Sequence, residues 1–264
     1  GDFDRVLTAA EISADIEGFQ RRKKESESNG RLRGLGLCYY IESILGDPSE
    51  EAKVVFEENG GVKIFVGTQS NGQGHETVFA QFLSDQTGIP TEKIIVVQGD
   101  SDLIPRGGGT GGSRSVTVQN NATLATVEKI IQSFSQYLSE KLGVDVENIE
   151  FDDISFRING SNYSPNVLEV ANMACEDQRF DLLTHSAKAT IAARSFPNGA
   201  HFAEVEIDPD TGFVQVVRYS VVDDFGNLIN PMLAEGQVHG GVAQGIGQAL
   251  YCLLYTSPSP RDRG

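Results

Sequence analysis

Tryptophan is absent from the 264-residue sequence, and cysteine is scarce, with three residues. No two cysteines stand in a C-x-x-C spacing, which excludes a disulfide framework, a four-cysteine zinc site and an iron–sulfur cluster held by this chain alone. A protein that makes so little use of cysteine fits a reducing compartment, so we expect a cytoplasmic location.

Basic residues are outnumbered by acidic ones, and long apolar runs are absent. Lysine and arginine number 21 against 37 acidic residues, a formal charge of -16, so nucleic acid is an unexpected partner. No apolar run approaches the roughly 18 residues of a membrane span, and we expect no membrane-spanning helix. The charged run at residues 21–24 is expected to be a solvated helix face.

Both ends of the sequence are unusual. The chain begins without methionine, and its last 13 residues change abruptly to a Ser/Pro/Arg composition. Residues 252–262 resemble one reading frame of a transposase adapter used in preparing sequencing libraries. We therefore expect residues 252–264 to be an adapter artefact and the chain to be a fragment.

Apolar periodicity predicts an α+β fold with mixed sheets and amphipathic helices. The predicted helices cover residues 1–29, 75–88, 115–142, 165–174 and 231–251. The predicted strands cover residues 35–45, 52–57, 62–68, 93–98, 203–207 and 214–222, with short strands near Ile149 and Phe156. The first three strands are expected to form a meander, residues 62–98 a strand–helix–strand layer, and residues 203–222 a hairpin.

Glycine, at 29 residues, is concentrated in three segments predicted to lie at or near helix starts. They are residues 71–75 (NGQGH), 107–115 (GGGTGGSRS) and 238–247 (VHGGVAQGIG). Helix N-termini offer free N–H groups, and glycine lets a bulky anion approach the backbone. Together the segments predict a site for a phosphate- or pterin-like ligand. Each alone is equally typical of a turn or of close helix packing.

Three glutamines accompany these segments: Gln73, Gln237 and Gln244. A side-chain amide can bond a heterocycle through both its donor and its acceptor. For any one glutamine an exposed position without function is the simpler interpretation.

Other chemical motifs are incomplete. His75-Glu76 begins like a zincin helix, but Phe79 stands where the second histidine is needed. The four histidines lack metal-ligand spacing and are expected to be structural. Residues 99–102 (GDSD) and 223–227 (DDFGN) are typical of turns. No Gly-Lys-Ser/Thr completes a P-loop, and no nucleophile with a base stands out.

Four segments together resemble the molybdenum-binding large subunit of the xanthine dehydrogenase, aldehyde oxidase and aerobic carbon monoxide dehydrogenase family. They are residues 67–77 (GTQSNGQGHET), 99–102, 110–115 (TGGSRS) and 235–247 (EGQVHGGVAQGIG). Their order and spacing match the family from about Asp2 to Tyr251, far more specifically than a single Gly-x-Gly.

The resemblance implies a molybdopterin cofactor, in bacteria usually the cytosine dinucleotide form, held by backbone N–H groups and amides without a side-chain ligand to molybdenum. The implied contacts to the pterin or its pyrophosphate are Gln73, Gly74, Thr110, Gly111, Ser113, Arg114 and Ser115. Gln237, Gly241 and Gln244 would bind the cofactor from the third segment, and the Gly112 backbone would lie near molybdenum.

The resemblance also implies hydroxylation of an aldehyde, an N-heterocycle or CO with oxygen from water. The family's catalytic glutamate lies in a Gly-Val-Gly-Glu motif that this sequence does not contain, so no residue here is assigned as catalytic and the chain alone is expected to be inactive. The implied partners are an iron–sulfur small subunit and an FAD-binding medium subunit, in a dimer of heterotrimers.

We expect residues 1–180 to be the C-terminal part of a first molybdopterin-binding domain and residues 181–251 to be part of a second, with the boundary in the weakly periodic stretch 179–197. Two alternatives remain at this point. One is a non-catalytic module that binds a nucleotide or polyphosphate through the same loops, and the other is a structural domain with glycine turns.

Overall fold

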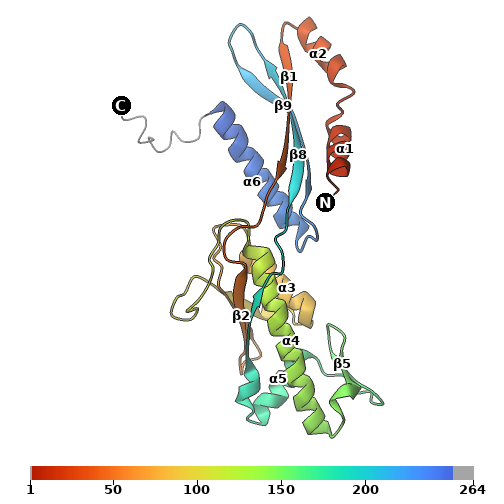
Figure 1. The fold of residues 1–264 in the computed structure, drawn as a ribbon, viewed down its shortest axis with the longest axis vertical. Coiled ribbons are helices and arrows are strands. Elements are labelled where there is room, and N and C mark those ends of the chain that lie inside the picture. Colours follow the sequence, from red (N-terminus) through yellow and green to blue (C-terminus); the bar gives the residue numbers. More distant parts are fainter. Residues whose placement is uncertain (1, 252–264) are drawn as a thin grey trace. The chain divides into compact units, whose positions relative to one another are not determined.

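The computed structural model describes residues 2–251, and their contacts divide them into two compact units (Figure 1). The first unit combines residues up to Ser43 with residues from Ser195 onward, and the second comprises Ile44–Arg194. The Arg194 boundary falls in the weakly periodic stretch, whereas the one at Ser43 has no counterpart in the sequence analysis. The division into cofactor-binding domains at residue 180 stays a prediction, and segment 252–264 lies outside the described residues.

The first unit is an antiparallel sheet of order β1-β8-β9 with helices. Its elements are α1 (Phe3–Ala14), α2 (Phe19–Ser28), β1 (Leu32–Ile41), β8 (Asn198–Ile207), β9 (Val214–Asp224) and α6 (Pro231–Leu250). The β8–β9 hairpin confirms the predicted one. Asn230 caps α6, its side chain accepting a bond from Leu233 N, and Pro231 occupies the first helical position, as predicted.

Helix α1 covers one face of this sheet. Strand residues alternate between faces, so Ala200 and Phe202 of β8 point toward α1 and are buried with Val6 and Ala10. His201 lies between them on the opposite face. The sheet therefore has a core face against α1 and a second face that carries different side chains.

The predicted helix at residues 1–29 is wrong in one respect: it is broken at Asp15. Asp15 adopts a left-handed conformation (φ 50°) that ends α1, and its side chain accepts a bond from Gly18 N. The break lets Arg22 pair with Asp15 and with Glu204, at 2.9 Å from the latter. Arg22 is mostly buried, so the interpretation of residues 21–24 as a solvated face fails at this position.

The second unit contains a four-stranded sheet of order β4-β3-β2-β7 and a short hairpin, β5-β6. Its elements are β2 (Ser49–Phe56), β3 (Val62–Val66), α3 (His75–Thr87), β4 (Ile94–Val97), α4 (Ser115–Leu142), β5 (Ile149–Phe151), β6 (Phe156–Ile158), α5 (Val167–Glu176) and β7 (Thr184–Thr190), with single 3-10 turns at Thr91–Lys93, Val146–Asn148 and Phe180–Leu183. Strands β3 and β4 run parallel with α3 between them, which confirms the predicted strand–helix–strand layer.

Helices α3 and α4 pack together, and α4 lies against β2 and β7. Val54 and Ile64 of the sheet are fully buried, as are Phe79 of α3 and Phe134 of α4. Glycines in left-handed conformation end both helices, Gly88 after α3 and Gly143 after α4. Within residues 2–251 no helix is long and apolar enough to span a membrane.

One prediction about the sheets is wrong, and one strand was not predicted. The expected meander does not form, because β1 pairs with β8 in the first unit while β2 pairs with β3 and β7 in the second. Strand β7 has no counterpart in the sequence analysis. Its residues Thr-His-Ser-Ala-Lys-Ala-Thr are small or polar, so the alternation of buried His185 and Ala187 gives little apolar signal.

Candidate functional site

The first candidate cluster lies at one edge of the four-stranded sheet. Because β3 and β4 are parallel, their carboxyl ends share an edge, and from it leave the loops at residues 67–74 and 98–114. These loops lead into the N-termini of α3 and α4. Crevices outside the carboxyl ends of such strands are where open α/β sheets bind ligands.

The loop that carries the first glycine segment is joined to the second glycine segment. Gly109 N donates to Gly67 O at 3.1 Å, and the Thr110 hydroxyl accepts from Gln69 N and donates to Gln69 O, at 2.9 and 2.6 Å. A Cβ on Gly107 would lie 2.3 Å from Gly67 O, so the backbones are in direct contact. The structure thus brings these two predicted segments into one surface.

A buried ion pair supports this surface from below. Glu50 of β2 and Arg114, the residue before α4, lie 3.0 Å apart with side chains 2% exposed. Glu50 also accepts from Gly108 N, and Arg114 donates to Gly109 O. The Arg114 guanidinium is therefore bonded within the protein, although the sequence analysis assigned Arg114 to the cofactor.

Seven glycines of the loops fall into two groups. For one group an added Cβ would meet neighbouring atoms at 3.0 Å or less: Gly67, Gly107, Gly108 and Gly112. For the other group nothing lies within 4 Å: Gly72, Gly109 and Gly111. The first group is required by packing, and the second leaves backbone open to an approaching molecule.

The other predicted residues of this cluster lie beside the open glycines. Gly74 precedes α3 in left-handed conformation, and Gln73 is half-buried with its Oε1 accepting from Asn71 N. Ser115 is buried at the start of α4 and bonds Thr110 at 3.2 Å. Ser113 is exposed at φ 56°, a conformation that costs energy for a residue with a side chain.

Three further buried side chains here were not identified as ligand-binding from the sequence. Thr68 and His75 are 1% exposed and Asn120 is 6% exposed, yet Thr68 Oγ1, His75 Nδ1 and both amide atoms of Asn120 have no protein partner. Burial holds the pKa of His75 below its ordinary value. Unpaired buried polar groups are rare, but the sequence around Asn120 does not reveal one, because nearby buried positions of α4, such as Gln119 and Thr123, are polar as well.

The third glycine segment behaves differently from the prediction. Residues 238–247 lie well inside α6, whose N-terminus is at Pro231. Their N–H groups therefore serve the helix and cannot form an anion site at a helix start. Gln237, Gly241 and Gln244 follow a spacing of four and three residues, so they lie on one helix face.

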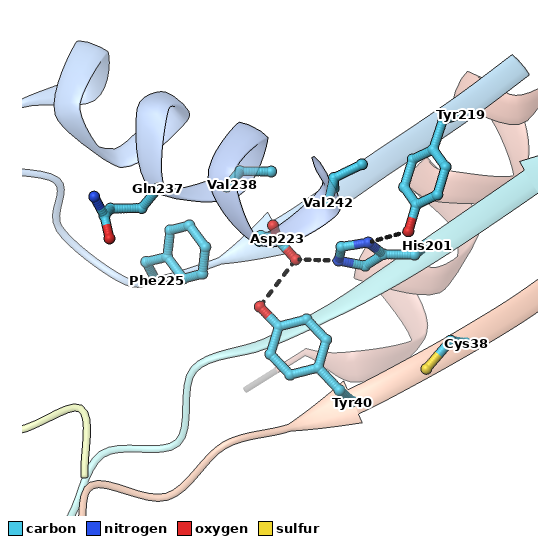
Figure 2. A pocket seen from close by; sticks show the side chains of 10 residues that line it. Cys38, Tyr40, His201, Tyr219, Asp223, Phe225, Gln237, Val238 and Val242 are labelled. Carbon is cyan, nitrogen blue, oxygen red and sulfur yellow. Dashed lines mark hydrogen bonds and ion pairs between the residues drawn. The ribbon is translucent and has the colours of Figure 1, made fainter. Parts of the chain in front are cut away.

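Part of that helix face lines a cavity of about 310 Å³ within the first unit. Figure 2 shows Gln237 and Val238 of α6 with Tyr40, His201 and Asp223 of the sheet. The cavity lies on the sheet face opposite the α1 core. Gly241 also lines it, whereas Gln244 is exposed and is not among its lining residues.

A chain of polar contacts crosses the sheet wall of this cavity. The Tyr40 hydroxyl donates to Asp223 Oδ1 at 3.0 Å, His201 Nε2 lies 3.3 Å from the same oxygen, and His201 Nδ1 lies 3.2 Å from the Tyr219 hydroxyl. The pKa of Tyr40 is raised, mainly because its hydroxyl is buried and also because the negative charge of Asp223 lies close to it. Asp223 is a strand residue, which corrects its assignment to a turn, whereas Asp100 does form a turn by accepting from Asp102 N.

Neither cluster is built to hold a bare metal ion. Within residues 2–251 no three His, Cys, Asp or Glu side chains gather in a geometry that could hold one. The chemistry of both clusters is that of backbone N–H groups, amides and hydroxyls.

Comparison with known proteins identifies the family of the chain. The family model of the molybdopterin cofactor-binding domain matches residues 9–258. The chain belongs to this family. The resemblance noted in the sequence is thereby confirmed, and so is the α+β fold class.

Relatives of this chain include proteins named as large subunits or large chains. It is 34% identical to the nicotine 6-hydroxylase large subunit of Paenarthrobacter nicotinovorans, over 95% of this chain and 33% of that protein. It is 31% identical to the carbon monoxide dehydrogenase large chain of Afipia carboxidovorans, over 88% and 31%. The structure of quinoline 2-oxidoreductase from Pseudomonas putida 86 superposes with a TM-score of 0.83 at 28% identity, over 94% and 34%. The chain spans about a third of the length of these relatives.

Proposed function

We propose that this chain holds part of a molybdenum–molybdopterin cofactor, in its cytosine dinucleotide form, within the large subunit of a molybdenum hydroxylase. The observation that carries the proposal is the open space at Gly72, next to Gln73 in the sequence, and at Gly109 and Gly111, in the loops that lead into α3 and α4. A dinucleotide brings a pyrophosphate, and helix N-termini with open glycines suit an anion of that size.

The residues present fit a polar, polycyclic ligand. Gln73 and Gly74 would contact it from the first loop, and Thr110, Gly111, Ser113 and Ser115 from the second. The Gly112 backbone would face molybdenum. The unpartnered polar groups of Thr68, His75 and Asn120 lie near the end of β3 and the starts of α3 and α4. A ligand rich in hydrogen-bond donors and acceptors would supply the partners that these buried groups do not have within the protein.

Helix α6 would contribute amides from the first unit. Gln237 and Gly241 line the cavity there, and Gln244 shares their helix face. An amide presents a donor and an acceptor together, which suits a pterin edge.

When bound, the cofactor supplies the redox centre that accepts electrons from a substrate: an aldehyde, an N-heterocycle or CO, oxidised with oxygen from water. The residues of this chain bind and orient the cofactor, and none of them is proposed as the catalytic base. A glutamate in a Gly-Val-Gly-Glu motif would have that role in the complete large subunit. We further propose an iron–sulfur small subunit, an FAD-binding medium subunit, a dimer of heterotrimers and a cytoplasmic location. The large-subunit and large-chain names of the relatives support the presence of other subunits.

The test is the cofactor content of the purified protein after substitution of its amides. In Gln73→Ala and Gln244→Ala we expect a several-fold loss of molybdenum and cytosine nucleotide per chain. Gln136→Ala, at an exposed position of α4, is the matched control and should keep both. A module that binds only nucleotides would contain nucleotide without molybdenum, and a structural domain would show no effect of either amide.

A further inference from the structure

Next to the backbone of the second glycine segment, the side chains of Glu50 and Arg114 are almost completely buried. They lie 3.0 Å apart with side chains 2% exposed. Burying two charges costs desolvation that their attraction does not reliably repay, so stability alone is a weak explanation for such a pair. The hydrogen bonds of the two side chains give a better one.

Arg114 uses its fork of donors on backbone carbonyls. Its Nε donates to Asp47 O and its Nη2 to Ser49 O, both at 2.8 Å, while Nη1 donates to Gly109 O at 2.7 Å. The first two carbonyls lie at the start of β2, and the third lies in the glycine loop. One planar guanidinium thus fixes the loop to the edge of the sheet.

Glu50 holds the preceding residue of the loop. Its Oε2 accepts from Gly108 N at 2.9 Å. A Cβ on Gly67 would lie 2.2 Å from Glu50 Oε1, and one on Gly108 would lie 2.4 Å from Arg114 Nη2. These glycines are therefore packed onto the ion pair, whereas Gly109 and Gly111 have open space.

We propose that Glu50 and Arg114 are positioning residues, which fix the backbone of Gly108 and Gly109 so that the open face at Gly109 and Gly111 is formed before any cofactor arrives. Arg114 then acts through the loop and is not a direct ligand of the cofactor through its side chain. Preformed geometry lowers the ordering cost of binding. The identity of the ligand in this inference rests on the proposed function, whereas the role of Glu50 and Arg114 in holding the loop does not.

The experiment measures amide hydrogen exchange in residues 107–113, together with the melting temperature and molybdenum content, in the protein as its gene encodes it. The main variant is the charge-free double substitution Glu50→Leu with Arg114→Met. It removes both charges at once and is expected to stay folded. We expect exchange in the loop to rise about tenfold or more, as for a segment released into local opening, and molybdenum per folded chain to fall several-fold.

Arg114→Lys is the second variant, in case the double one does not fold. It keeps the charge but lacks the planar fork, so loop exchange should still rise. The control is an exposed ion pair of the same unit, removed as Arg179→Met with Glu140→Leu, which should leave loop exchange unchanged.

The inference is overturned if a folded double variant, or Arg114→Lys, shows the same hydrogen exchange in the loop as the wild type. If exchange rises in the variants while the wild type itself contains no molybdenum, the positioning role holds and the proposed function fails.

Discussion

Gly107 lies directly against Gly67, so that a Cβ on Gly107 would be 2.3 Å from the Gly67 carbonyl oxygen. The contact joins the loop after β3, which carries the first glycine segment, to the second glycine segment in the loop after β4. Gly111, in the same loop, has no atom within 4 Å of the position of a Cβ.

We therefore expect opposite results from alanine at these two glycines. Gly107→Ala should destabilise the cofactor-free protein by about 1–3 kcal/mol, since a methyl group is forced into filled space. Gly111→Ala should leave the melting temperature unchanged yet lower the molybdenum content, because its methyl group occupies the open face. Thermal unfolding and elemental analysis check the pair, and equal melting temperatures for both variants would contradict the account.

Removing Glu204 should strongly destabilise the first unit. Its carboxylate is 1% exposed and pairs with Arg22 at 2.9 Å and Arg33 at 2.8 Å. Glu204→Ala leaves buried positive charge unpaired, which costs about 3–5 kcal/mol. Glu140→Ala removes an exposed partner of Arg179 and should change the free energy of unfolding by less than about 1 kcal/mol. Urea denaturation distinguishes them, and a Glu204 effect as small as that of Glu140 would refute the burial argument.

Stability should fall as the solution becomes mildly acidic. Burial lowers the pKa of His75 and of His185 from the ordinary value of 6.5. At pH values between 6.5 and the lowered pKa values, the unfolded chain binds protons at these histidines that the folded chain does not bind. The contribution of the two neutral histidines to the free energy of unfolding is therefore fully present above pH 6.5 and is lost as the pH falls through the lowered pKa values. The urea midpoint should decrease between pH 7 and pH 5.5, and less so in His75→Gln. A midpoint independent of pH in the wild type would rule this out.

Gly199 makes room for the contact between Tyr40 and Asp223. A Cβ at Gly199 would lie 2.7 Å from Tyr40 Cε1 and would overlap Asp223 Oδ1. Gly199→Ala should displace the carboxylate, so the raised pKa of Tyr40 should fall toward its ordinary value in an ultraviolet titration of the tyrosines. Gly36→Ala, with open space on β1, is the control. Identical titrations of the two variants would be evidence against the contact.

Local signals allowed much of this fold to be predicted. Helix α4 and the β8–β9 hairpin follow from apolar periodicity and turn residues, and Asn230-Pro231 fixed the start of α6. Sheet membership could not be predicted, because the pairing of β1 with β8 joins distant parts of the chain. The weak apolar pattern of β7 concealed a strand.

The candidate site divides in the same way. Glycine segments could be recognised as loops, but which glycines pack and which stay open depends on neighbours such as Gly67 and Arg114 that only the fold brings together. The third segment lies within the helix whose start at Pro231 was predicted, so the expectation of an anion site at or near a helix start does not apply to its glycines. The contact between His201 and Asp223 could not be predicted, because it depends on the register in which β8 pairs with β9.

The most direct measurement of the central claim is the molybdenum and cytosine nucleotide content of the protein, purified as its gene encodes it from cells supplied with molybdate. The account predicts one molybdenum and one cytosine nucleotide per chain, both reduced several-fold by Gln73→Ala. A folded protein that contains neither molybdenum nor cytosine nucleotide would contradict it.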